Sequence, residues 1–173
     1  MRDRVLRAGR GRFFALFLAI GCLPLIANGS YSKDKFLDRL AGHWRAEGVA
    51  FGMQARYQMK WEWVLDGRFA RISYRIDMKG SDGKEQFFEG HGYYSPAGEG
   101  NYEGRWFDSQ GEAHPIKASL NDNALVSIWG TPETKQGKSI YRLLENGNLE
   151  LSDSLLMKDG TWRRFNHAIF ERQ

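Results

Sequence analysis

Three polar residues fall on an otherwise apolar face of the last predicted hairpin, and they are the first candidates for chemistry. A two-residue turn at Asp159-Gly160 would place Asp153 opposite Asn166. The same register places Arg164 opposite Leu155, on the same face. A carboxylate and a guanidinium taken out of water must be satisfied by each other or by a bound molecule. The pattern leaves both interpretations open: a structural ion pair, or a group that orients a ligand.

The other residues that could do chemistry form no recognisable catalytic or metal site. Glu89 and His91 share one face of a predicted strand and could act as a base and its orienter, but no nucleophile accompanies them. The sequence has no G-x-S-x-G motif and no glycine-rich phosphate loop. Its histidines are scattered, without the close spacing of a zinc site: His43, His91, His114 and His167. We therefore predict neither an enzyme nor a cofactor.

The elements that would position the polar residues are predicted to be strands. Apolar residues at helical spacing predict one short helix over Lys33–Leu40, before the first strand. Connections between the strands are too short for crossover helices, and closing the sheet removes its exposed edges. The predicted fold class is therefore all-β, an antiparallel up-and-down barrel of about ten strands. The predicted strands are His43–Phe51, Met53–Leu65, Arg68–Met78, Glu85–Tyr94, Asn101–Asp108, Ala113–Leu120, Ala124–Gly130, Ser139–Glu145, Leu149–Met157 and Thr161–Glu171.

The hairpin around Asp66-Gly67 has the clearest predicted register. A type I′ turn there gives one face that is entirely apolar or aromatic. On the opposite face, Glu62 meets Arg71 across the ladder. Arg56 meets Asp77 in the same way. A slip of one residue would bury these charges, so the apolar face should point into the barrel. That face carries four aromatic residues that we expect to contact a ligand: Tyr57, Trp61, Trp63 and Tyr74.

The first predicted strand opens with a recognisable motif, AGHWRAEG over Ala41–Gly48. Gly42 and Trp44 match the G-x-W signature, so the chain resembles the calycin barrels, which include lipocalins and fatty-acid-binding proteins. The longer pattern G-x-W-x-G-x-G is similar to that of the nitrobindin-like haem-binding barrels, matched at Gly42, Trp44 and Gly48, with Ala46 in place of the middle glycine. The resemblance implies that Trp44 plugs the narrow end of the barrel.

Two further segments extend the resemblance over most of the chain. VLDGRF (Val64–Phe69) and AIFER (Ala168–Arg172) make the sequence similar to small lipocalin-like bacterial proteins of unassigned activity. In lipocalins an arginine stacks on the plug tryptophan, which gives Arg164 a second possible structural role. Fatty-acid-binding proteins end in an R-x-Y clamp, whereas the matching positions here are Ala168 and Phe170. A fatty-acid clamp of that kind is therefore not predicted.

The first 29 residues resemble a targeting segment. Five arginines and one aspartate precede the apolar run Phe13–Ala27, which is shorter than a membrane span. Ala27-Asn28-Gly29 offers small residues to a signal peptidase, so we predict a signal peptide over 1–29 and a barrel domain over 30–173. A bacterial lipobox that ends in Cys22 is the alternative. Either interpretation predicts an exported protein, periplasmic or extracellular, without a membrane span in its mature form.

Removing that segment also removes the excess of positive charge. The chain has 25 basic and 21 acidic side chains, and residues 1–29 hold five arginines and one aspartate, so 20 of each sign remain. The mature domain then has no net charge and no block of like charges, so a nucleic-acid partner is not predicted. The single cysteine leaves with the segment.

These observations favour a non-enzymatic barrel that holds a small apolar or amphipathic molecule in its interior. Inward aromatic residues with a few polar groups, here Asp153, Arg164 and Asn166, are typical of small-molecule sites. One alternative is a nitrobindin-like haem barrel that acts on nitric oxide or peroxynitrite. His167 lies closest to where such relatives supply their axial ligand, but strand alternation points it outward. The other alternative is a filled barrel that binds proteins on its outer face.

Overall fold

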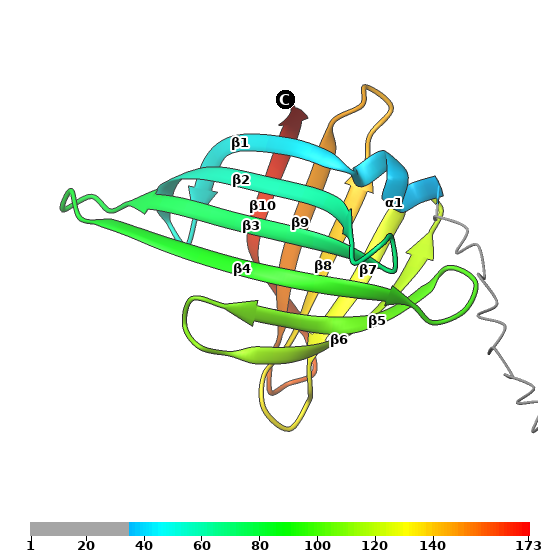
Figure 1. The fold of residues 1–173 in the computed structure, drawn as a ribbon. Coiled ribbons are helices and arrows are strands. Elements are labelled where there is room, and N and C mark those ends of the chain that lie inside the picture. Colours follow the sequence, from blue (N-terminus) through cyan, green and yellow to red (C-terminus); the bar gives the residue numbers. More distant parts are fainter. Residues whose placement is uncertain (1–34) are drawn as a thin grey trace, which may run out of the picture. The chain divides into compact units, whose positions relative to one another are not determined.

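A computed structural model describes residues 35–173, and the predicted signal peptide lies outside these described residues. Figure 1 shows a short helix followed by strands. Every predicted strand is present, within three residues of its predicted bounds. The elements are α1 (Lys35–Leu40), β1 (Gly42–Ala50), β2 (Met53–Val64), β3 (Phe69–Lys79), β4 (Glu85–Pro96), β5 (Asn101–Asp108), β6 (Ala113–Asn121), β7 (Ala124–Gly130), β8 (Gln136–Leu143), β9 (Leu149–Leu156) and β10 (Trp162–Arg172).

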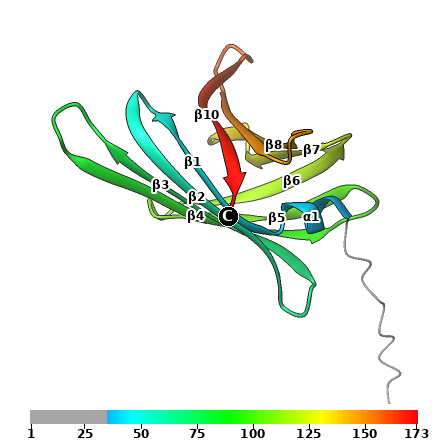
Figure 2. The same ribbon diagram turned by 90° about the horizontal axis from the view of Figure 1, so that it is seen from above.

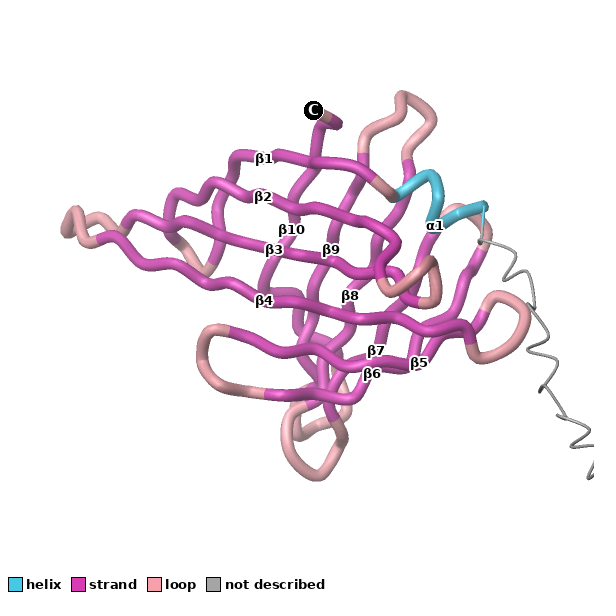
Figure 3. The backbone as a smooth tube through the Cα atoms, viewed as in Figure 1, coloured by secondary structure: helices cyan, strands magenta, loops and turns pink. Residues whose placement is uncertain are grey.

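The strands form one closed antiparallel barrel. Each strand pairs with the next along the chain, and β1 pairs with β10 to close the ring. In Figure 1, β1–β4 run across β7–β10 at a steep angle. Figure 2 shows the strands from above, curving around the interior, and Figure 3 shows that short turns join them. The predicted up-and-down barrel is confirmed.

The Asp66-Gly67 turn sets the register of β2 and β3 as predicted. Asp66 and Gly67 have φ angles of 59° and 75°, the left-handed conformation that a type I′ turn requires at both central residues. Trp63 lies opposite Ala70 and Tyr57 opposite Ile76, so the apolar face is continuous along the hairpin.

The outer face of this hairpin carries the charged residues. Glu62 lies opposite Arg71 and forms an ion pair with it. Arg56 lies opposite Asp77 as predicted, but its nearest carboxylate is that of Glu47, 3.7 Å away on β1. The cross-strand positions are confirmed, and only the first of the two expected ion pairs forms across them.

The last hairpin differs from the prediction near its turn. The Met157 amide donates to the Thr161 carbonyl at 2.8 Å, which makes a three-residue loop instead of a two-residue one. The strands therefore start one residue out of the expected register, and a β-bulge between Arg164 and Asn166 restores it. Asn166 lies opposite Asp153 as expected. Arg164, however, is exposed, so the prediction that it faces the interior is wrong.

Trp44 closes one end of the barrel. Its side chain is 1% exposed, and its Nε1 donates to the Leu40 carbonyl of α1 at 2.8 Å. The Arg172 guanidinium lies 4.2 Å from the centre of the indole ring. A side chain at Gly42 would collide with this guanidinium, which explains the glycine of the motif. The arginine stacked on the plug is therefore Arg172 and not Arg164.

Side chains fill the half of the barrel next to the plug. The most completely buried apolar side chains of the packed half are Leu40, Trp44, Trp61, Ile72, Leu125, Leu149 and Phe170.

Among the described residues, no helix is long and apolar enough to cross a membrane.

Candidate binding cavity

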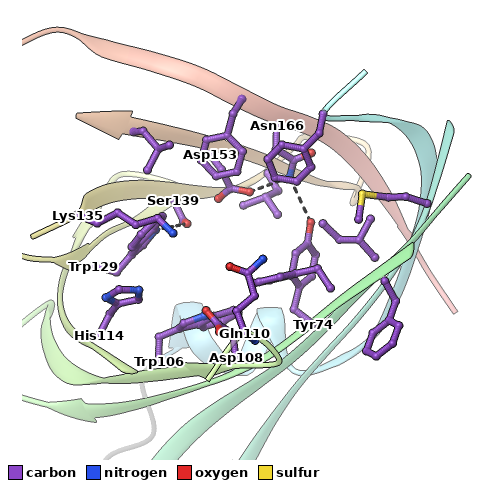
Figure 4. A pocket seen from close by; sticks show the side chains of 18 of the residues that line it. Tyr74, Trp106, Asp108, Gln110, His114, Trp129, Lys135, Ser139, Asp153 and Asn166 are labelled. Atoms are coloured by element: carbon purple, nitrogen blue, oxygen red, sulfur yellow. Dashed lines mark hydrogen bonds between the residues drawn. The ribbon is translucent and has the colours of Figure 1, made fainter. Parts of the chain in front are cut away.

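The other half of the barrel is hollow. A cavity of about 430 Å³ opens at the end where the β1–β2, β3–β4, β5–β6, β7–β8 and β9–β10 turns meet. This volume falls within the range of small-molecule sites. Most of the lining is apolar or aromatic, and Figure 4 shows it with the polar groups that interrupt it. The interior is thus packed at the plug and open at the opposite end.

Two tryptophans form much of the aromatic wall, and glycines make room for them. Trp106 on β5 lies opposite Gly92 on β4, and its ring covers Gly90, where a Cβ would collide with it. Trp129 on β7 lies opposite Gly137 on β8, where a Cβ would also meet the ring. A glycine beside each indole lets the ring lie against the sheet. The Gly90-x-Gly92 pattern therefore fits a wall that holds an indole.

One polar network crosses the deep wall of the cavity. Asn166 on β10 donates through Nδ2 to Asp153 Oδ2 at 2.7 Å and to the Tyr74 hydroxyl at 3.2 Å. Tyr57 donates its hydroxyl to Asn166 Oδ1 at 3.0 Å. Ser139, opposite Asp153 on β8, donates to the same carboxylate. Figure 4 shows Asp153, Asn166 and Tyr74 converging on the cavity.

Asp153 is the buried charge of this network. Only 7% of the residue is exposed, and burial raises the pKa of its carboxyl to about 6. Hydrogen bonds from Ser139 and Asn166 act in the opposite direction, because they stabilise the ionised form. The carboxylate therefore keeps its charge at neutral pH, in a site where ionisation is costly.

A second polar group lies at the mouth of the cavity. Asp108, Glu112 and His114 bring one ligand atom each to within 4.8 Å of one another, which is compatible with a metal ion. Glu112 already accepts from Lys135 Nζ at 3.0 Å and lies 2.9 Å from His114 Nε2. The ammonium of Lys135 occupies the carboxylate that a cation would need, so we assign no metal to this group.

The structure brings together three of the seven residues predicted to contact a ligand. Tyr74, Asp153 and Asn166 line the cavity. Tyr57 lies behind them, as a hydrogen-bond partner of Asn166.

The remaining predicted residues lie elsewhere. Trp61 packs in the filled half, with its ring 5.4 Å from that of Tyr94. Trp63 is half-buried and donates to Asp38 of α1 at 2.7 Å, away from the cavity. Arg164 is exposed. Of the motif residues, Gly42 and Trp44 belong to the plug, whereas Gly48 has room for a side chain beside Tyr57. Of the seven residues predicted to contact a ligand, Trp61, Trp63 and Arg164 therefore lie away from the cavity.

Several residues of the cavity wall were not predicted from the sequence, notably Trp106, Trp129, Ser139 and Phe165. Strand alternation could have found Ser139, because it shares a face with the buried Tyr141 and Leu143. Phe165 could not be found in this way, because the bulge turns it inward.

The described histidines are divided between the two faces of the barrel. His114 lines the cavity. His167 is exposed on the outer face, with its Nε2 3.0 Å from Glu150 Oε1. His91 lies on β4, 3.1 Å from the Ser73 hydroxyl. His167, the candidate axial ligand of the haem alternative, is therefore outside the cavity.

Comparisons with known proteins support the fold and leave the ligand open. No family model matches the chain, and no curated protein matches it. The crystal structure of Rv2717c from M. tuberculosis is similar, with a TM-score of 0.57, and the match covers 81% of this chain and 98% of that one. The two sequences are 15% identical, so the likeness concerns the fold alone. The chain therefore has a β-barrel architecture, consistent with a calycin-like barrel, that also occurs in Rv2717c.

Proposed function

We propose that this protein is an exported, non-enzymatic barrel that binds a small apolar or amphipathic molecule in its open half. The observation that carries the proposal is the cavity of about 430 Å³, with an aromatic wall and a single polar network at its base. Sites of this composition bind ligands by burying apolar surface and use a few polar groups for orientation. The filled-core alternative has less support, because only the plug half is filled.

Export is part of the proposal and has its own test. The support is the arginine-rich segment and apolar run before Ala27-Asn28-Gly29. We expect the intact mass of the protein recovered from its source to match a chain that starts near residue 30. A mass that retains Cys22 with an added lipid would assign the protein to the lipoproteins, and a full-length mass would contradict export.

Binding in the cavity can be tested with the neutral dye Nile red, which becomes fluorescent in apolar surroundings. Leu155 lines the cavity from β9, so L155W adds an indole to the space that the dye needs. Ile169 is 49% exposed on β10, and I169W adds the same group to the outside. We expect dye affinity to fall at least about tenfold in L155W, equivalent to roughly 1.4 kcal/mol. In I169W it should change less than about twofold.

Equal effects of the two substitutions would show that the dye binds outside the cavity. Absence of dye binding by the wild type, with the fold verified by circular dichroism, would contradict the proposed function.

A further inference from the structure

Asp153 is a buried carboxylate without a countercharge. Its hydrogen-bond donors, Ser139 and Asn166, are both neutral. Throughout residues 35–173, no lysine, arginine or histidine forms an ion pair with it. Charged groups in protein interiors normally have a partner of opposite charge, because their loss of hydration is not otherwise compensated. The carboxylate therefore has unused capacity for a positive partner.

The nearest cationic part of the cavity wall does not supply that partner. Lys135 lines the mouth, but its ammonium lies 3.0 Å from Glu112 Oε2 and is paired there. Arg164, which the sequence placed beside Asp153, is exposed beyond the bulge. A positive partner for this carboxylate would therefore have to come from a molecule that enters the cavity.

Four buried tyrosines from different strands lie close enough to the Asp153–Asn166 pair to interact with it. They are Tyr57, Tyr74, Tyr94 and Tyr141, from β2, β3, β4 and β8. Burial raises the pKa of each of these tyrosines, and the negative charge of Asp153 raises it further. They are therefore neutral at physiological pH. Three of them, Tyr74, Tyr94 and Tyr141, line the cavity itself. Aromatic rings attract cations through the negative charge of their faces, and such cages are a known means of binding ammonium groups.

We propose that the ligand is an organic cation: an amphipathic amine whose ammonium group binds Asp153 and whose apolar body lies against Trp106 and Trp129. This inference rests on the proposed function and narrows it. An ammonium would donate charge-assisted hydrogen bonds to a carboxylate that accepts only two from the protein. An anionic ligand, such as a fatty acid, would meet repulsion from the same group. The mouth also carries charged groups, among them Asp108 and Lys135, so their effect must be separated from that of Asp153.

Three matched probes test the charge requirement by isothermal titration calorimetry at pH 8. They are 2-naphthylmethylamine, 2-naphthylmethanol and 2-naphthoate, which present a cation, a neutral donor and an anion on one ring system. We expect the amine to bind at least about tenfold more tightly than the alcohol, and the naphthoate to bind most weakly. In D153N this preference for the amine should fall below about threefold. D108N, which neutralises a carboxylate at the mouth, should keep the preference.

Lowering the pH gives a second readout that needs no substitution at Asp153. Amine affinity should fall as the pH drops from 8 to 5, because the carboxyl takes up a proton, whereas alcohol affinity should stay constant. The four tyrosines remain neutral over this range. Repeating the series in H114Q removes the histidine at the mouth from the comparison.

The outcomes separate the two proposals. Equal affinities of amine and alcohol in the wild type, or an amine preference that survives in D153N, would overturn the cationic ligand and leave the binding barrel standing. A pH series in which amine and alcohol respond alike would also overturn it. Failure of all three probes and of Nile red to bind would overturn both.

Discussion

Replacing Asp153 with asparagine should change how the stability of the protein depends on pH. The pKa of this carboxyl is about 6 in the folded protein, against an ordinary value of 3.8. Each tenfold change in proton affinity is worth about 1.4 kcal/mol, so the difference corresponds to about 3 kcal/mol. Because the folded pKa is the higher one, the stabilising contribution of the protonated group is complete below about pH 4. It is lost as the pH rises to about 6 and changes little above that.

We therefore expect the stability of D153N, relative to that of the wild type, to rise by about 2.5 kcal/mol between pH 4 and pH 7.5. Urea titrations of both proteins at several pH values measure the free energy of unfolding directly. D159N is the matched control, because hydrogen bonds from Thr161 hold the pKa of this exposed carboxyl below its ordinary value. This carboxyl is already ionised above about pH 4 in both the folded and the unfolded chain, so D159N should follow the wild type closely between pH 4 and pH 7.5 and differ from it only in more acidic solution. If the difference in free energy of unfolding between D153N and the wild type changes by less than about 1 kcal/mol between the two pH values, the carboxylate of Asp153 is not buried and unpaired as described.

Three other substitutions have defined outcomes. Trp44→Ala should lower the free energy of unfolding, measured by urea titration, by about 3 to 5 kcal/mol, because it leaves a cavity where the indole ring packs against Arg172. A loss below about 1 kcal/mol would mean that the ring is not part of the core. Arg164→Met should change the free energy of unfolding by less than about 0.5 kcal/mol and leave Nile red affinity unaltered, because the side chain is exposed. Weaker dye binding would show that Arg164 does contribute to the binding site. Gly137→Ala should cost about 1 to 3 kcal/mol and weaken dye binding, because the added methyl displaces the Trp129 ring, and an unchanged Trp129 environment would contradict this packing.

Most of the fold could be predicted because local signals agree along the chain. The Asp66-Gly67 turn allows only left-handed conformations at its centre, and a single register puts every charge of the hairpin outside. Turn chemistry and face pattern therefore fix β2 and β3 without tertiary information. The plug could be predicted from Gly42 and Trp44 by resemblance, and the structure adds the reason for the glycine, which is the space taken by Arg172.

The binding site was predicted only in part, because its limits depend on contacts between distant strands. Strand alternation distinguishes inside from outside, but it does not tell the packed half from the hollow one, so Trp61 and Tyr74 looked equivalent. Phe165 faces the cavity in place of Arg164 because the β9–β10 loop has one residue more than expected. The turn sequence Asp159-Gly160 does not reveal this extra residue. Because of this bulge, the ion pair between Asp153 and Arg164, one of the two predicted interpretations, does not form.

The most direct measurement is a crystal structure with 6-bromo-2-naphthylmethylamine, recorded at the bromine absorption edge. We expect one strong anomalous peak in the cavity between Trp106 and Trp129. We also expect density for the amine nitrogen within hydrogen-bond distance of the Asp153 carboxylate. A cavity without bromine, or a peak on the outer face of the barrel, would contradict the claim that the open half is the binding site.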